Sequence, residues 1–370
     1  MARKKAFTFR SLINDLHLWL GLGSGIILFL VCLSGTILTF EHEIKAAGAE
    51  TVTVTPTGEP RPVTSLIEQL ETADYGTVTG VSLPSAPTEP WSFTVKKDPS
   101  ERRGRTLLVD PYTGDFHEVS GSPYDAFFRS MFFLHRWLLL DTEVGRPIVG
   151  VATVIFLFLS LSGLVLWFPR RLRWKNLRQG LRVKTDGSRK RLNHDLHNTL
   201  GFYACGLLIV MCLTGLCWSF EGYREGLGKV IGAKVFDRSG PELPIVSGEA
   251  KVGPERAIAL AQAAFPHPGE LTVSFPGSAD EPYRIRKYDA ASWSPVVYDQ
   301  LYLSVGGTEL AREHYADKPL GERIAGAIKP LHTGEIFGWW SKVLYFLACL
   351  IATSLPVTGT LIWWGKLKRR

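Results

Sequence analysis

The stretch LINDLHLWLG at residues 12–21 recurs as LNHDLHNTLG at residues 192–201, which is an offset of 180 residues. The similarity continues at the same offset, because CLSG at 32–35 matches CLTG at 212–215. In both copies, a histidine precedes an uncharged apolar stretch. The sequence therefore predicts an internal duplication, in which each half begins with a helix that has a histidine near its start.

The second part of each half is also repeated, although more loosely. FLHRWLLLDTEVG at 133–145 resembles PLHTGEIFG at 330–338, and LSGLVLWF at 161–168 resembles PVTGTLIWW at 356–364. Each copy again contains one histidine, at the same point relative to the apolar stretch that follows. We therefore expect two parallel copies of one arrangement, namely a span, an outer domain and a second span.

Four uncharged apolar stretches predict a membrane protein. They are Gly21–Phe40, Val149–Phe168, Thr199–Phe220 and Val343–Trp364. Each has the length of about twenty residues that a helix needs to cross a hydrocarbon core of about 30 Å. All five cysteines of the chain lie in these stretches. This distribution excludes a soluble enzyme, a disulfide-stabilised secreted domain and a zinc cluster.

The basic residues, which give the chain a net charge of +7, are unevenly distributed. They precede the first span, fill the short connection between the second and third spans, and follow the fourth span: Arg3, Lys4, Lys5, Arg10, Arg170, Arg171, Arg173, Lys175, Arg178, Arg182, Lys184, Arg189, Lys190, Arg191, Lys366, Lys368, Arg369 and Arg370. The positive-inside rule then predicts that both termini and the short loop are cytoplasmic. Because topology explains the charge, no nucleic-acid partner is expected.

The two long connections have mixed charge and are expected to fold outside the membrane. Each begins with an amphipathic helix, VTSLIEQL at 63–70 or PERAIALAQAAF at 254–265, and continues into alternating segments that predict strands. The expected fold class is a mainly α membrane protein, with a four-transmembrane-helix bundle and two outer α+β domains, internally duplicated. The expected boundaries are a cytoplasmic N-terminus at 1–10, transmembrane helices at 11–40 and 196–220, outer domains at 41–130 and 221–325, outer segments that lead into transmembrane helices at 131–168 and 326–364, a basic cytoplasmic loop at 169–195 and a cytoplasmic tail at 365–370.

Two pairs of histidines occupy matched positions in the repeat. His17 and His197 lie at the cytoplasmic ends of the first and third spans, and His135 and His332 precede the second and fourth spans. An ionisable side chain at membrane depth is costly and therefore indicates a function. Because neutral imidazole is a good iron ligand, we expect two haem irons, each held by one imidazole from each half.

Helix length determines which histidines can pair. His17 lies about 35 Å along its helix from Phe40, so it cannot share a haem with His135. The expected axial pairs are therefore His17 with His197 and His135 with His332. An iron with both axial positions filled suits electron transfer better than oxygen binding. The sequence contains no C-x-x-C-H motif, so both groups would be haem b.

Small residues follow both cytoplasmic histidines at helical spacing. They are Gly21, Ser24 and Gly35 after His17, and Gly201, Ala204 and Gly215 after His197. A flat porphyrin needs such a gap beside its ligand, and we favour this interpretation because of the histidines. Close packing between helices is the alternative explanation of the small residues.

Several further residues are weaker candidates. His194, three residues before His197, could bond to a haem propionate or compete as a ligand, and His42 is a further candidate ligand. Arg129, Arg136 and Arg146 could pair with propionates or only neutralise the surface. The histidines of the outer segments, His117, His267 and His314, are expected to be ordinary domain residues.

Over nearly its whole length, the chain resembles the PepSY-associated transmembrane family. The specific parts are DLHLWLG with CLSGTILTFEHE, LHRWLLLDTEVGRPIVG with LSGLVLWFPR, DLHNTLGFY with CLTGLCWSFE, and PLHTGE. At these motifs it is similar to FoxB-type siderophore-iron reductases of the inner membrane, which contain two b haems. The resemblance implies that His17, His135, His197 and His332 are the axial ligands, and that the outer segments are periplasmic PepSY-like α+β domains.

The same resemblance implies an activity. The expected protein is a di-haem b oxidoreductase of the bacterial inner membrane that reduces a ferric siderophore, or another ferric chelate, in the periplasm and releases Fe(II). Some family members contain a flavin-binding reductase domain that this sequence lacks, so a separate cytoplasmic reductase or a quinol is expected to donate the electrons. Two alternatives stay open: a di-haem cytochrome b that serves a quinone, cupric ion or a periplasmic protein, and a non-enzymatic membrane protein that binds a peptide or a protease.

Overall fold

The computed structural model describes residues 8–48, 52–98, 100–101, 104–119, 121–237, 240–244, 246, 248–278, 280–294 and 296–368. It contains two compact units. The helical unit comprises Met1–Ile44, Tyr124–Val235 and Ile324–Arg370, and the sheet unit comprises Lys45–Pro123 and Phe236–Arg323. Part of the topology prediction rests on Arg3, Lys4, Lys5, Arg369 and Arg370, which lie outside the described residues.

Within the described residues, four helical segments are long and apolar enough to cross a membrane. They are α1 (Phe9–Leu38), α5 (Thr142–Trp167), the segment Arg189–Ser219 and α12 (Trp339–Leu367). Hydrocarbon offers the backbone no water, so a spanning segment satisfies its N–H and C=O groups within a helix. The four predicted spans are confirmed, and the chain is a membrane protein.

The helix that contains the third span extends beyond the predicted apolar stretch. It starts at Arg189 and consists of α7 (Arg189–Asp195), the π-helical turn η1 (Leu196–Leu200) and α8 (Gly201–Ser219). The Ser188 side chain accepts a hydrogen bond from the Arg191 N–H and caps α7. The expected basic loop at 169–195 therefore contains α7 as well as the short helix α6 (Trp174–Gly180).

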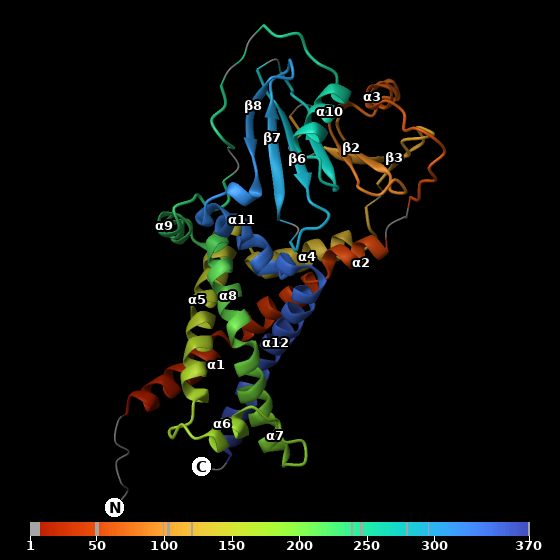
Figure 1. Ribbon diagram of the computed structural model, residues 1–370. Helices are drawn as coiled ribbons and strands as arrows, with labels where there is room; N and C mark the ends of the chain where they lie inside the picture. Colours follow the sequence, from red (N-terminus) through yellow and green to blue (C-terminus); the bar gives the residue numbers. More distant parts are fainter. Residues whose placement is uncertain are drawn as a thin grey trace, which may run out of the picture. The chain divides into compact units, whose positions relative to one another are not determined.

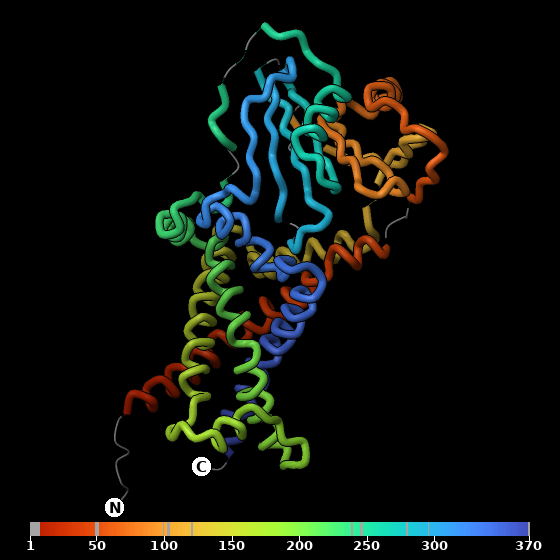
Figure 2. The backbone as a smooth tube through the Cα atoms, viewed as in Figure 1, coloured from red at the N-terminus to blue at the C-terminus, as the bar shows by residue number. Residues whose placement is uncertain are grey.

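Helix pairs within the helical unit pack through small side chains. The helix α1 contacts α5 and α12, and α8 contacts the same two helices (Figure 2). Between α8 and α12, Ala204 and Ala348 are buried in one cluster. Between α1 and α5, Leu28 and Ala152 are buried in another. In lipid, the hydrophobic effect does not drive helices together, so their association depends on close packing. Small residues allow two helix backbones to approach closely.

Two shorter helices precede the second and fourth spans. They are α4 (Asp125–Trp137) and α11 (Leu320–Thr333), and the 3-10 turn η3 (Glu335–Phe337) follows α11. They begin before the expected boundaries at 131 and 326. The chain turns from α4 into α5 through Leu138 and Leu139, which both have positive φ angles, of 56° and 60°. The expected segments 131–168 and 326–364 are therefore each a short helix followed by a separate span.

The two outer segments build one sheet, whereas the sequence analysis expected two separate domains. The strand order is β4-β3-β2-β1-β5-β6-β7-β8. The strands are β1 (Thr77–Leu83), β2 (Trp91–Lys96), β3 (Arg105–Val109), β4 (Phe116–Glu118), β5 (Leu271–Ser274), β6 (Tyr283–Tyr288), β7 (Tyr298–Leu303) and β8 (Glu309–Glu313). Antiparallel pairing of β1 with β5 joins the two segments. Without this pairing, β1 and β5 would each be an exposed edge strand with unpaired backbone groups. The two outer segments therefore form one sheet instead of two separate domains.

A glycine makes that central pairing possible. Gly80 of β1 pairs with Ser274 of β5. A Cβ at Gly80 would lie 2.8 Å from the carbonyl oxygen of Val273, so a larger residue would push the strands apart. The two halves of the sheet consequently share one core, in which Phe93 and Leu107 from the first half pack with residues such as Ile285 from the second.

The same order of elements occurs twice in the sheet unit. The helix α3 (Val63–Thr72) precedes β1–β4, and α10 (Pro254–Ala264) precedes β5–β8, as the amphipathic patterns predicted (Figure 1). The two helices contact each other. Glu255 of α10 accepts hydrogen bonds from the N–H of Thr64, at 2.6 Å, and from its hydroxyl, at 2.7 Å. The remaining short elements are α2 (Glu41–Ala47), α9 (Glu221–Ile231) and η2 (Tyr315–Asp317).

Candidate functional site: two facing histidine pairs

The four repeat-matched histidines form two close pairs. The ring centres of His17 on α1 and His197 on η1 are 6.4 Å apart, and their planes are inclined by 86°. The ring centres of His135 on α4 and His332 on α11 are 6.2 Å apart, with planes inclined by 58°. The structure thus brings together the histidines that the sequence paired, while their role as haem ligands stays a prediction.

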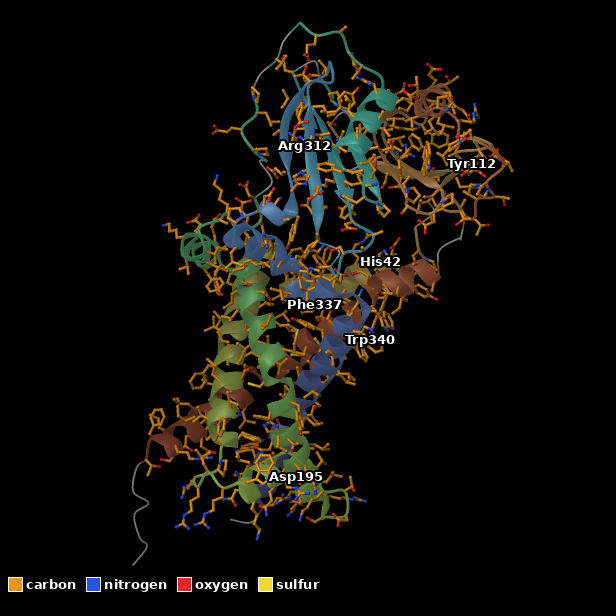
Figure 3. All side chains as sticks on the ribbon, in the orientation of Figure 1. His42, Tyr112, Asp195, Arg312, Phe337 and Trp340 are labelled. Carbon is orange, nitrogen blue, oxygen red and sulfur yellow. The ribbon has the colours of Figure 1, made fainter. Side chains whose placement is uncertain are left out.

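The two pairs lie at opposite ends of the helical unit. Figure 3 shows Asp195, two residues before His197, at one end, and Phe337, five residues after His332, at the other. Helix α1 reaches both pairs, because it carries His17 and its Gly35 contacts the ring of His135. The separation of 18 residues (35 − 17) corresponds to about 27 Å along the helix.

A hydroxyl of a neighbouring helix fixes each ring of the first pair. Nδ1 of His17 lies 2.8 Å from Oγ of Ser162, and Nδ1 of His197 lies 2.9 Å from Oγ1 of Thr358. Both hydroxyls also have donor geometry to a backbone carbonyl one turn earlier. When a hydroxyl donates to that carbonyl, it accepts from Nδ1–H, and the lone pair of the imidazole is then on Nε2.

Backbone carbonyls fix the rings of the second pair. Nδ1 of His135 lies 2.9 Å from the carbonyl oxygen of Val31, and Nδ1 of His332 lies 3.0 Å from that of Met211. A carbonyl can only accept, so Nδ1 carries the proton in both rings. Hydroxyls again lie near, since Nδ1 of His135 is 3.4 Å from Oγ of Ser34 and Nδ1 of His332 is 3.1 Å from Oγ1 of Thr214.

This hydrogen bonding is the arrangement found around metal-bound histidine. A ligating imidazole usually donates its other ring N–H to a carbonyl or similar acceptor, which fixes the tautomer and the ring orientation. Within the described part of the chain, no hydrogen bond involves Nε2 of any of the four histidines. All four Nε2 atoms are therefore available as ligands.

A glycine lies against each of the four rings. A Cβ at the glycine would lie 3.0 to 3.4 Å from Cε1 of the ring: Gly35 faces His135, Gly215 faces His332, Gly163 faces His17 and Gly359 faces His197. Each glycine directly follows the serine or threonine that contacts the same ring, at Ser34, Thr214, Ser162 and Thr358. Four Ser/Thr–Gly dipeptides thus position the four histidines: the hydroxyl contacts Nδ1 of the ring, and the glycine leaves room for Cε1. Sequence reasoning quoted these dipeptides as repeat matches without recognising this role.

Gly35 and Gly215 share a helix face with the histidine of their own helix, 18 residues along the chain. In the structure they lie against the rings of His135 on α4 and His332 on α11, near the other end of the span. Gly21 and Gly201, one turn beyond His17 and His197, face the side chains of Leu159 and Leu355.

The spacing of each pair suits two imidazoles on one metal ion. With nitrogen–metal bonds of about 2 Å and about 1.1 Å from each nitrogen to its ring centre, the centres would be about 6.2 Å apart. Among the described residues, no group of three or more His, Cys, Asp or Glu side chains could hold a metal ion. Each pair therefore offers two imidazoles at this spacing and needs the other ligands from elsewhere. The four pyrrole nitrogens of haem would supply them, so the donor set fits haem.

The backbone around His197 departs from its repeat partner. His17 lies in a regular α-helix, whereas His197 lies in the π-helical turn η1. Such turns are rare and frequently occur at functional sites. Thr199 fastens the turn to the end of α6, because its hydroxyl donates to the carbonyl of Gly180 at 2.9 Å. Periodicity alone could not reveal this π-helical turn.

Neither weaker histidine candidate joins a pair. The side chain of His194 is 57% exposed and lies 3.5 Å from the carboxylate of Asp195. His42 is exposed and lies on α2, beyond the end of α1 (Figure 3).

The sequence analysis missed a buried charge cluster near the second pair. Lys342 of α12 is 6% exposed, and its Nζ lies 2.7 Å from Oε1 of Glu43 and 3.3 Å from Oε1 of Glu335. Glu335 follows His332 by three residues, and the hydroxyl of Thr333 donates to its other oxygen at 3.2 Å. The signal for this cluster was a lysine at the start of an apolar span.

The sheet unit contains a separate cavity of about 340 Å³. At its edge, one carboxylate oxygen of Asp299 lies 3.3 Å from Nε2 of His267 and 3.3 Å from Nδ1 of His314. The sequence analysis took both histidines as ordinary domain residues. Their convergence on Asp299 depends on the pairing of β7 with its neighbours, which the sequence pattern did not reveal.

A comparison with known families identifies one match. The model of the family described as the PepSY-associated TM region matches residues 15–366. The match includes all four histidines and all four Ser/Thr–Gly dipeptides. No curated protein matches the chain.

Proposed function

The chain belongs to the PepSY-associated transmembrane family, and on that premise we propose that it is a di-haem b oxidoreductase of the bacterial inner membrane. It passes electrons across the membrane to a ferric siderophore, or another ferric chelate, in the periplasm, and it releases Fe(II). The observation that supports this function most is the pair of ring separations, 6.4 Å and 6.2 Å, in two histidine pairs whose Nδ1 atoms are all engaged.

The residues of the chain hold and orient the cofactor. His17 and His197 hold one haem, and His135 and His332 hold the other. When bound, each haem supplies one-electron transfer. With two imidazole ligands, each haem would have no coordination site open to oxygen and would supply electron transfer alone. The Ser/Thr–Gly dipeptides keep each ring in one tautomer and one orientation.

The topology of the proposal follows from the basic residues. The termini and the loop at 169–195 are cytoplasmic, and the sheet unit, built from two PepSY-like α+β repeats, is periplasmic. The pair His17–His197 is then near the cytoplasm, and the pair His135–His332 is near the periplasm. Electrons enter from a cytoplasmic reductase or a quinol and leave at the second pair.

The reaction changes only oxidation states. The donor loses one electron for each Fe(III) that becomes Fe(II), and a quinol donor also releases its protons. Siderophores bind iron through hard oxygen ligands, which favour Fe(III) over Fe(II). Reduction therefore releases the iron while the chelator stays intact, and no acid–base residue of the chain is needed.

The absorption spectrum of the purified full-length protein tests the proposal. Protein expressed with sufficient haem should show Soret and α bands and contain two haems per chain. Ferric chelate should oxidise the reduced protein faster than a quinone, cupric ion or a periplasmic redox protein does. Faster oxidation by one of these acceptors would favour the cytochrome alternative. Colourless protein would exclude both electron-transfer functions and favour a peptide-binding role, for which the cavity beside Asp299 is a candidate site.

A further inference from the structure

The two halves of the helical unit differ in charge beside the second histidine pair. In the second half, Lys342 is neutralised, because its Nζ lies 2.7 Å and 2.9 Å from the two carboxylate oxygens of Glu43 and 3.3 Å from Oε1 of Glu335. In the repeat, Lys342 corresponds to Arg146, at the offset of 196 residues that also relates Gly163 to Gly359. A symmetric protein would neutralise both cations in the same way.

The counterpart of Glu43 for Arg146 is not an acid. The position that corresponds to Glu43, at the offset of 180 residues, is Tyr223. Within the described residues, no carboxylate lies within 4 Å of Arg146 or Arg136, and neither guanidinium donates a hydrogen bond. Two cations therefore lie without protein counter-charges on the side of the first half.

The two arginines are near each other and near the histidine pair. At Gly145 the start of α5 packs so tightly against the end of α4 that a Cβ would overlap the carbonyl group of Trp137. Burial and the neighbouring charge of Arg146 lower the pKa of Arg136. The charge of Arg136 also acts on both His135 and His332.

Aromatic rings surround one of the two guanidiniums. The Cζ atom of Arg136 lies 5.6 Å from the ring centre of Phe132 and 5.5 Å from that of Trp137. Ring faces attract a cation but do not neutralise it. A partly buried guanidinium with only aromatic neighbours therefore still favours an anionic partner.

An unpaired donor lies in the same place. The indole Nε1 of Trp137 is buried, and no hydrogen-bond acceptor for it exists among the described residues. Buried donors in proteins nearly always have a partner. The indole N–H and the partly buried guanidinium of Arg136 thus lie close together near the junction of α4 and α5, where Arg146 adds a second positive charge.

We infer that Arg136, Arg146 and the indole N–H of Trp137 form a binding site for a carboxylate beside the pair His135–His332. The inference rests on the proposed function for the identity of the ligand. The carboxylate comes either from an anionic ferric chelate or from the propionates of the haem held by this pair. Guanidinium groups bind carboxylates with two parallel hydrogen bonds, and an indole N–H can add a third.

The test compares the full-length protein with the double variant Arg136→Gln/Arg146→Gln. Lys329→Gln is the matched control, because it removes one exposed cation from α11, three residues before His332. The single variant Arg146→Gln changes an exposed side chain, so it keeps the test valid if the double variant does not fold. One arm measures binding of the redox-inert gallium(III)–citrate complex and of an uncharged gallium(III)–trihydroxamate by equilibrium dialysis. The other arm measures haem per chain and the rate of haem transfer to apomyoglobin.

A chelate site predicts that the double variant binds gallium(III)–citrate about tenfold more weakly and the uncharged complex unchanged. A propionate site predicts that one haem leaves the double variant about tenfold faster, with chelate binding unchanged. Either result supports the carboxylate site and identifies its source. If both quantities stay within about twofold of wild type and of Lys329→Gln, the inference is wrong. Wild-type protein without haem would refute the proposed function. The dialysis measurement with gallium(III)–citrate would still show whether the arginines bind a carboxylate.

Discussion

Gly35 of α1 lies directly against the ring of His135 on α4. A Cβ at Gly35 would be 3.0 Å from Cε1 and 3.3 Å from Nδ1 of that ring. The same helix carries His17 of the first pair. One helix therefore carries a histidine of the first pair at one end and lies against a histidine of the second pair at the other, and Gly215 of α8 lies against His332 in the same way as Gly35 lies against His135. This arrangement leads to predictions that distinguish the two sites.

Replacing Gly35 by alanine should weaken only the second site. The added methyl group must displace the ring of His135 by a few tenths of an ångström, which takes up most of the misplacement of about 0.5 Å that a binding site tolerates. We expect the haem of this site to dissociate at least about tenfold faster, with the other haem unchanged. Gly23→Ala is the matched control on the same helix, because nothing lies within 4 Å of its Cβ position. Equal behaviour of the two variants would contradict the role of Gly35.

Removing one histidine should remove one haem. His135→Ala and His332→Ala should each retain only the haem of the first pair and lose reduction of external chelate. His17→Ala and His197→Ala should each retain only the other haem. A pyridine haemochrome assay, which counts haem per chain, would measure one instead of two in each variant. Loss of both haems from a single substitution would mean that the pairing is wrong.

The hydroxyl of Thr358 should matter for the first site. It accepts from Nδ1–H of His197 at 2.9 Å, and such partners of ligating histidines change metal affinity by about 10–100-fold when removed. Thr358→Val should therefore speed haem loss from this site by about tenfold, whereas Thr358→Ser keeps the hydroxyl and should behave like wild type. Time-resolved haem transfer to apomyoglobin measures both. Similar loss from the serine variant would indicate a packing effect instead.

The contact between α10 and α3 should make the stability of the sheet unit depend on pH. Burial acts to raise the pKa of Glu255, but the hydrogen bonds from Thr64 outweigh it and hold the pKa below its ordinary value. A carboxyl with a lowered folded-state pKa stabilises the fold above its unfolded pKa, and this contribution is lost as the pH falls through the folded pKa. Glu255→Ala should therefore cost about 1 kcal/mol at neutral pH and less in acid.

Thermal unfolding of the full-length protein at several pH values checks this prediction. Glu68→Ala is the control, because Glu68 is an exposed residue of the adjoining helix α3. A constant difference between Glu255→Ala and wild type from neutral to acidic pH would show that the carboxylate charge is not involved.

The sequence predicted the parts of the fold that depend on local pattern. Uncharged stretches identified the four spans, and alternation identified the strands and the helices near residues 63 and 254. The pairing of β1 with β5 was not predictable in the same way. It joins strands almost 200 residues apart, and only their complementary edges in the folded state specify it.

The histidine pairs were predictable because duplication selects them from nine histidines. Their surroundings were not, because Ser162 and Thr358 look like ordinary small residues of apolar helices until the helices pack. The cluster of Lys342 with Glu43 and Glu335 likewise combines residues distant in sequence. Spacing along one helix predicts which residues share a face, but it does not predict which neighbouring helix that face meets.

Low-temperature electron paramagnetic resonance of the oxidised, full-length protein, together with a count of haem per chain, tests the central claim most directly. Facing imidazoles in both pairs predict two haems per chain, with two low-spin ferric signals of bis-imidazole type. One signal should disappear in His17→Ala and the other in His332→Ala. High-spin iron in the wild-type protein, or protein without haem after expression with excess haem, would contradict the account.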